Sequence, residues 1–320
     1  MSDVVALGEL LIDFACQSTD AAGYPTLAAN PGGAPANYLA ALQQYGCTTA
    51  LMAKVGEDAF GHLLIGTLKQ CGIDTQGVLR DSSVFTTLAF VTLDAAGNRS
   101  FSFARKPGAD TCLREDELLP LLPLIDDCRV FHFGTLSLTD EPVRSATKLA
   151  VVYAKRQGKL ISLDPNFRKP LWTSDEAARE QMEWSLHQAD IVKISDEEIE
   201  FLWGLSPEAG AEKLLHEYGV SLVYATLGAK GCYAANGSAS VMVKTPDGIH
   251  AVDTTGAGDI FGGSAMSRFL RMNKSPEALN ADELREIVRF ACCAASLSTQ
   301  KMGGLSSVVP MDAVLNAMEQ

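Results

Sequence analysis

Strands and helices alternate regularly along the second half of the chain, and this alternation constrains the fold more than any other feature. Short apolar runs are each followed by a stretch whose apolar residues recur at helical spacing. The expected strands are 130–133, 159–163, 189–194 and 220–226, and the expected helices lie near 141–157, 175–187 and 197–203. Strands joined by crossover helices pair in parallel. The sequence therefore predicts an α/β fold, with a doubly wound, mostly parallel sheet in a single domain over 1–320.

Polar residues follow the ends of several expected strands. They are Asp13, Asn166, Ser195, Glu198, Thr226, Gly228 and Asp259. In a doubly wound sheet the ligand binds beyond the carboxyl ends of the strands. The shared position of these residues indicates that they form one site. For Asp13, which interrupts an apolar run, the alternative is a strand-end carboxylate that points to water or caps a turn.

A ribbon of two β-rich runs, 86–93 and 100–105, interrupts the α/β pattern without an intervening helix. Residues 94–98, DAAGN, are typical of a hairpin turn. We expect this ribbon to form a flap outside the main sheet. Arg105 at its end would then project toward whatever the flap covers, although an exposed arginine at a strand end is the simpler alternative.

The stretch 251–263, AVDTTGAGDIFGG, combines small residues, hydroxyls and a carboxylate just before an apolar helical pattern. A turn of Gly256, Ala257 and Gly258 that opens a helix leaves N–H groups free for a phosphate or an oxyanion. Asp259 in the first turn can accept the proton of a substrate hydroxyl, or it can merely stabilise the helix end. The glycine spacing does not match a dinucleotide fingerprint, and no Walker-type phosphate loop occurs.

A second group of small residues lies at 30–37, NPGGAPAN, ahead of a helix expected over 38–45. At Gly32 and Gly33 the backbone can approach a polar ligand closely, with the Asn37 amide beside it. The alternative is a plain turn with a capping asparagine.

Composition narrows the classes of partner. The formal net charge is −13 and no block of Lys and Arg occurs, which argues against nucleic acid and anionic membranes. The apolar runs are too short to span a membrane, and the N-terminus does not resemble a signal peptide. The eight cysteines lack C-x-x-C spacing and the five histidines are isolated, so neither a disulfide framework nor a zinc site is indicated. We expect free thiols in the cytoplasm.

Six segments carry a resemblance to a known family. They are NPGGAPAN (30–37), FARKPGAD (103–110), DPNFRKPLW (164–172), ADIVKISDEEIEFLWG (189–204), ATLGAKGC (225–232) and DTTGAGD (253–259). In this order they resemble the ribokinase-like sugar kinases, the phosphofructokinase-B family, and among these the fructokinases most closely. The resemblance covers nearly the whole chain. It implies phosphate transfer from ATP to fructose, with a lid formed by about 14–30 and 85–106.

The resemblance also implies roles for individual residues. Asp259 matches the catalytic base, and Gly256, Ala257 and Gly258 match the anion hole. Sugar contacts are implied for Asp13, Gly32, Gly33, Asn37, Arg105, Asn166 and Arg168. ATP contacts are implied for Lys193, Ser195, Thr226, Gly228 and Gly231. Ser195 stands where the ribokinase pattern N-x-x-E has asparagine.

Metal ions and assembly are implied in the same way. Glu198 matches the position that organises Mg²⁺ indirectly. The K⁺ candidates are Asp253, Thr255, Ser298, Gly303 and Ser307. Members of the family often pair through their lids, so a homodimer is expected. Three alternatives stay open: the same chemistry on 2-keto-3-deoxygluconate, ribose or a riboside, with Arg105 as the discriminating residue; a non-catalytic sugar sensor; and, more remotely, a nicotinamide dehydrogenase.

Overall fold

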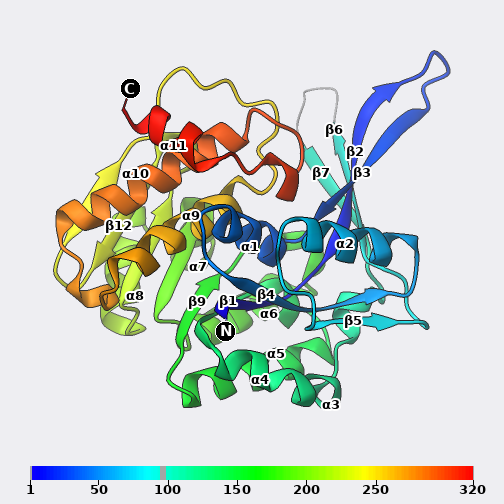
Figure 1. Cartoon of the computed structure of the whole chain (residues 1–320), viewed down its shortest axis with the longest axis horizontal. Helices are drawn as coiled ribbons and strands as arrows, with labels where there is room; N and C mark the ends of the chain where they lie inside the picture. Colours follow the sequence, from blue (N-terminus) through cyan, green and yellow to red (C-terminus); the bar gives the residue numbers. More distant parts are fainter. Residues whose placement is uncertain (1, 94–98, 320) are drawn as a thin grey trace.

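A central sheet of nine strands organises the molecule, in a computed structural model that describes residues 2–93 and 99–319 (Figure 1). The strand order is β13-β12-β11-β10-β9-β8-β1-β4-β5. The strands from β11 to β5 are parallel, and β12 and β13 add antiparallel at one edge. Their bounds are β1 Ser2–Leu7, β4 Thr49–Gly56, β5 Val78–Asp81, β8 Cys128–Gly134, β9 Leu160–Asp164, β10 Ile191–Ser195, β11 Leu222–Thr226, β12 Cys232–Asn236 and β13 Ser240–Val243.

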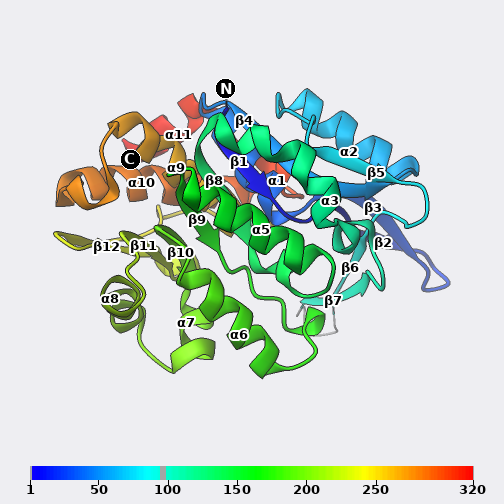
Figure 2. The same cartoon turned by 90° about the horizontal axis from the view of Figure 1, so that it is seen from below.

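Helices cover both faces of this sheet, so the predicted doubly wound α/β fold is confirmed (Figure 2). One face carries α1 Ala34–Gln44, α2 Ala59–Gln70, α9 Ala257–Met272, α10 Ala281–Ser298 and α11 Met311–Met318. The other carries α3 Glu115–Leu118, α4 Leu122–Asp126, α5 Val143–Arg156, α6 Asp175–Leu186, α7 Asp196–Trp203 and α8 Pro207–Glu217. The expected helices near 141–157, 175–187 and 197–203 correspond to α5, α6 and α7.

Alternation along β1 shows why the sheet needs two helix layers. Val4 and Ala6 pack into one apolar core with α1, α9 and α10, whereas Val5 and Leu7 pack into the other core with α5. Successive side chains of a strand point to opposite faces. A strand that is apolar at every position is therefore stable only when both faces are covered.

A separate sheet of four strands, in the order β3-β2-β6-β7, stands beside the main one (Figure 1). Its strands are β2 Leu11–Thr19, β3 Pro25–Gly32, β6 Leu88–Leu93 and β7 Arg99–Ala104. The expected β ribbon outside the main sheet is confirmed, while its turn at 94–98 lies outside the described residues. The chain leaves the main sheet after β1, and β2 pairs with β3 and β6.

None of the helices in the described part of the chain is long and apolar enough to cross a membrane.

Candidate active site

The site is built around the start of α9. Gly256 precedes the helix with a φ of 75°, in the left-handed region that favours glycine. A Cβ at this position would lie 3.0 Å from both Gly304 Cα and Asn37 Nδ2. Among the described residues no side chain caps the helix. The first turn therefore leaves backbone N–H groups for an anion.

Two cavities meet at this helix start. One, of about 250 Å³, is lined by Thr255, Gly256 and Asp259. The other, of about 350 Å³, is lined by Ala257 and Gly258. Thr254 lines both. We refer to them below as the acidic cavity and the apolar cavity, after the residues on their other walls. A group that is transferred between two ligands in these cavities would pass directly over the helix N-terminus.

The acidic cavity collects most of the residues expected to hold a sugar. Five of the residues expected to contact the sugar line this cavity: Asp13, Gly33, Asn37, Asn166 and Arg168. Gly32 lies next to it, because a Cβ there would be 2.3 Å from Asp13 Oδ2. Sequence reasoning gave no role to six further lining residues: Glu9, Leu11, Ala34, Phe103, Leu136 and Thr254. The signal that could have indicated Phe103 is its place in the FARKPGAD segment. Glu9 belongs to no motif, and its only signal is that it is a polar residue after a strand.

Asp259 is a candidate base in the acidic cavity. Its side chain is buried, and the Asn37 side-chain amide donates a hydrogen bond to Oδ2 at 2.9 Å. Burial, reinforced by the charge of Asp164, raises the pKa of Asp259 to about 7, although Asn37 and Lys193 oppose the shift. A carboxylate with a pKa near neutrality is well suited to accept a proton from a substrate hydroxyl.

Lys193 lies on the opposite side of the helix start. Its Nζ donates to Asp164 at 3.1 Å, and a Cβ at Gly258 would lie 3.0 Å from that Nζ. Burial pushes the pKa of Lys193 down, but the nearby carboxylates, led by Asp164, hold it above its usual value. A fixed positive charge therefore lies beside the backbone amides of the first turn.

Ser195 and Glu198 form a rigid support behind this charge. The Glu198 carboxylate accepts hydrogen bonds from the backbone N–H of Ser195 and of Phe167, both at 2.8 Å. The Ser195 hydroxyl in turn caps α7. Lys193, Ser195 and Glu198 are absent from the described linings of both cavities. Both Glu198 oxygens accept backbone hydrogen bonds, which tie β10 and α7 to the segment at Phe167.

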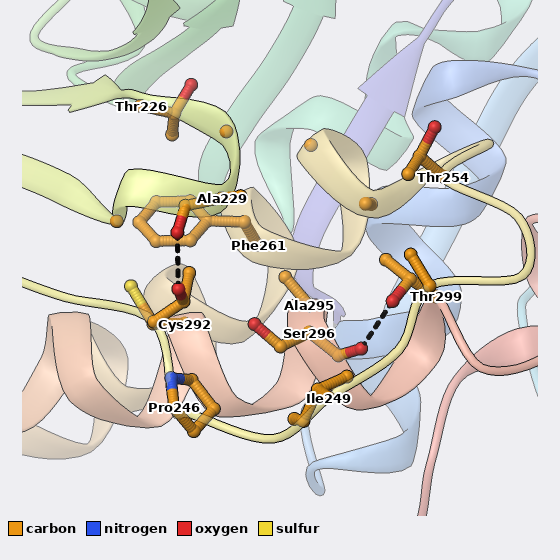
Figure 3. Close-up of a pocket in the computed structure, with 16 residues that line it drawn as sticks. Thr226, Ala229, Pro246, Ile249, Thr254, Phe261, Cys292, Ala295, Ser296 and Thr299 are labelled. Atoms are coloured by element: carbon orange, nitrogen blue, oxygen red, sulfur yellow. Dashed lines mark hydrogen bonds between the residues drawn. The ribbon is translucent and has the colours of Figure 1, made fainter.

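The apolar cavity is lined by the expected Thr226, which ends β11 (Figure 3), and by Gly228 and Gly231 just after it. Gly231 has a φ of 110°, and a Cβ there would lie 2.0 Å from the Val243 carbonyl oxygen. Apolar side chains that sequence reasoning missed complete the walls: Pro246, Ile249, Phe261, Cys292 and Ala295. These side chains come from α9, α10 and the loop at 245–249. No local sequence motif connects these three segments.

The K⁺ candidates lie around the loop that precedes α9. Asp253 Oδ1 accepts from the Thr255 hydroxyl at 2.7 Å, and Oδ2 accepts from the Gly303 N–H at 3.0 Å. Ser298 and Ser307 are buried and donate to the Ala295 and Gly304 carbonyls. The oxygen-rich set suits a hard cation. In the described residues no cluster of three or more His, Cys, Asp or Glu offers a metal site.

Arg105 departs from the expectation that its guanidinium projects toward the sugar. Its side chain is 3% exposed and donates to Asp110 and to the Leu136 carbonyl, each at 2.8 Å. The Thr139 hydroxyl accepts a further bond at 2.8 Å. Arg105 is not among the described residues that line either cavity. A buried guanidinium must be paired, and here protein groups satisfy it beneath the site.

Comparison with known proteins identifies the family. The profile of the pfkB family carbohydrate kinases matches residues 1–311. The probable fructokinase-4 of Arabidopsis thaliana is 41% identical over 313 residues, which cover 95% of this chain and 93% of the relative.

Solved structures with a similar fold support the same family. A fructokinase from Xylella fastidiosa with bound ATP has a TM-score of 0.90 at 28% identity, covering 100% of this chain and 99% of that one. A fructokinase double mutant from Vibrio cholerae, with fructose, ADP and a potassium ion bound, has a TM-score of 0.86 at 29% identity, covering 99% and 98%. With its helix-start site and a family match along nearly its whole length, the chain belongs to the pfkB family of carbohydrate kinases.

Proposed function

We propose that this protein is an ATP-dependent fructokinase, which converts D-fructose and ATP to fructose 6-phosphate and ADP. One observation carries the proposal: the start of α9 separates two cavities, with Asp259 on one side and Gly258 on the other. The sugar occupies the acidic cavity and ATP the apolar cavity. The fructokinase relatives support this choice of acceptor.

The chemistry follows from this arrangement. Asp259 accepts the proton of the sugar hydroxyl as its oxygen attacks the γ-phosphorus of ATP, and the bond to the ADP oxygen breaks. Phosphoryl transfer depends mainly on positioning and charge stabilisation. The amides of Gly256, Ala257 and Gly258 and the ammonium of Lys193 supply that stabilisation. Asn37 holds Asp259 in place through its amide.

Two metal ions complete the proposal. Mg²⁺ would neutralise charge on the ATP phosphates, held mostly by those phosphates and water, with Glu198 ordering the surrounding loops. A monovalent cation, K⁺, would bind at the loop of Asp253 and Thr255, where carboxylate and hydroxyl oxygens gather.

The surroundings of Arg105 favour a neutral sugar. An acid sugar such as 2-keto-3-deoxygluconate needs a cation for its carboxylate, but Asp110 already pairs with Arg105. Three carboxylates, from Glu9, Asp13 and Asp259, line the acidic cavity instead. Arg168 is the one cation among the described lining residues, so carboxyl groups outnumber cations there and the pocket disfavours an acid sugar.

The four-stranded sheet acts as a lid over the sugar, in this proposal, through residues 14–30 and 85–106. Asp13 from β2 and Phe103 from β7 line the acidic cavity, so closure of this sheet would exclude water from the phosphate. We further propose that two lids pair in a homodimer. We also propose that the protein works in the cytoplasm, because its eight cysteines are free.

An ADP-release assay across a panel of sugars tests the substrate. Fructose is expected to react best, and turnover of 2-keto-3-deoxygluconate, ribose or a nucleoside without turnover of fructose would overturn the choice of acceptor.

The role of Asp259 is tested by Asp259→Asn. We expect kcat to fall by at least ~100-fold with fructose binding largely kept, because the amide cannot accept the proton. Asp282→Asn is the matched control, since its side chain is 92% exposed and distant from the site. An unchanged rate in Asp259→Asn would mean that another group is the base.

A further inference from the structure

Glu9 is a buried carboxylate that the chemistry above leaves without a role. It lies between β1 and β2 at the carboxyl end of β1, is 3% exposed, and lines the acidic cavity together with Asp13 and Asp259. Burying a carboxylate is costly unless it is paired or protonated. No ion pair joins Glu9 to a cation within the described residues.

One oxygen of Glu9 holds the start of α1. Its Oε1 accepts a hydrogen bond from the Ala34 N–H at 2.8 Å. The N-cap residue, Gly33, has no side chain to do this, and a Cβ on Gly33 would lie 2.4 Å from the Glu9 carbonyl oxygen. Glu9 therefore replaces the missing cap. The helix that it caps carries Asn37, whose amide holds Asp259.

The charges that face Glu9 are mostly negative. Asp13 and Asp259 share its cavity, and Asp110 lies nearby with Arg105. Arg105 is committed to Asp110, and Arg168, the cation in the described lining, is itself exposed. Burial raises the pKa of Glu9 to about 7, with Asp110 adding to the shift and Arg105 opposing it. A large part of Glu9 therefore keeps its proton at neutral pH.

We propose that Glu9 is a sugar-positioning residue that binds the substrate in its protonated form. Oε1 accepts from the Ala34 N–H, and the protonated second oxygen donates a hydrogen bond to a hydroxyl oxygen of the sugar. This inference rests on the proposed function, because it assigns the acidic cavity to a sugar. It explains why a carboxyl group caps α1. One oxygen of Glu9 holds the helix that orients Asp259, and the other oxygen binds the substrate.

The test compares Glu9→Gln with the wild type across pH, at saturating ATP. The glutamine amide keeps both an acceptor for Ala34 and a donor for the sugar, but it cannot ionise. In the wild type, KM for fructose should rise above pH 7 as Glu9 loses its proton, and should level off once Glu9 is fully ionised. In Glu9→Gln, KM should match the wild type near pH 6.5 and stay level at higher pH.

Glu9→Ala removes both bonds and should raise KM for fructose by about 10–100-fold near pH 6.5, with no further rise at higher pH and with KM for ATP little changed. Glu57→Gln, at an exposed carboxylate paired with Arg80, is the control. A wild-type KM that stays level, or a Glu9→Gln KM that rises like that of the wild type, would overturn the inference.

Failure of the inference is distinguishable from failure of the proposed function. If the wild type does not phosphorylate fructose, the choice of substrate is wrong, and the same comparison is run with the sugar of the panel that does react. If Glu9→Ala does not fold, the Glu9→Gln profile still decides.

Discussion

At the scale of single residues, the proposed role of Asp259 as the base makes phosphate transfer depend on its protonation. Its raised pKa of about 7 means that the carboxylate, the form able to accept a proton, predominates only above neutral pH. We expect kcat at saturating sugar and ATP to fall about tenfold per pH unit below this point. A pH–rate profile measures this, and a kcat that stays constant down to pH 5 would contradict the assignment.

Asn37 provides a second prediction at this scale. Its amide hydrogen bond stabilises the charged form of Asp259 and so lowers the pKa of that carboxyl. In Asn37→Ala the acid limb of the kcat profile should move up by about one to two pH units, because a hydrogen bond to a charged group contributes about 1.5–3 kcal/mol. Asn316→Ala, at an exposed position of α11, should leave the limb in place.

At the scale of elements, the close packing of α1 on α9 aligns Asn37 with Asp259. A Cβ at Gly263 would lie 2.2 Å from the Tyr38 carbonyl oxygen and 3.0 Å from Ala41 Cβ. Gly263→Ala must therefore push the two helices apart. We expect it to destabilise the protein by about 1–3 kcal/mol and to lower kcat.

The matched control is Gly66→Ala in α2, where a Cβ would meet nothing within 4 Å. Alanine is a better helix former than glycine, so this change should stabilise the protein by about 0.5–1 kcal/mol. Thermal unfolding of the two variants measures whether Gly263→Ala is less stable and Gly66→Ala more stable than the wild type. Equal effects would show that helix propensity, and not the α1–α9 contact, governs position 263.

At the scale of the whole molecule, the proposed dimer concerns the four-stranded sheet. Its edge strand β3 and the preceding turn present Leu27, 37% exposed, and Tyr24, 70% exposed. Apolar side chains on an edge strand are a liability unless something covers them. Leu27→Asp should shift the protein from dimer to monomer in size-exclusion chromatography with light scattering, whereas Leu315→Asp, at an exposed residue of α11, should not.

Several features were predictable because they depend on local sequence. The alternation after residue 130 indicated β8–β11 with α5–α7, and the small residues at 256–258 indicated the start of α9. A polar residue that follows a parallel strand lies at the ligand-binding edge wherever that strand sits in the sheet. Asn166, which follows the parallel strand β9, was therefore placed at this edge by position alone. Asp13 reaches the same cavity from within β2 of the four-stranded sheet, and Asp259 reaches it from the first turn of α9, so the reason expected for these two residues was wrong.

Other features depended on contacts between distant segments. Whether Arg105 meets a sugar depends on Asp110, Thr139 and Leu136, which accept hydrogen bonds from three of its five N–H donors and hold it in a buried position. The role of Glu9 depends on how closely the β1–β2 turn approaches the start of α1. The sequence by itself determined the alternation of strands and helices after residue 130 and the edge of the main sheet where polar groups gather, whereas the helix expected over 38–45 begins at Ala34 and β3 was not predicted. Only the tertiary structure decided which of those groups remain available to a ligand, because hydrogen bonding and desolvation depend on neighbours that local sequence does not specify.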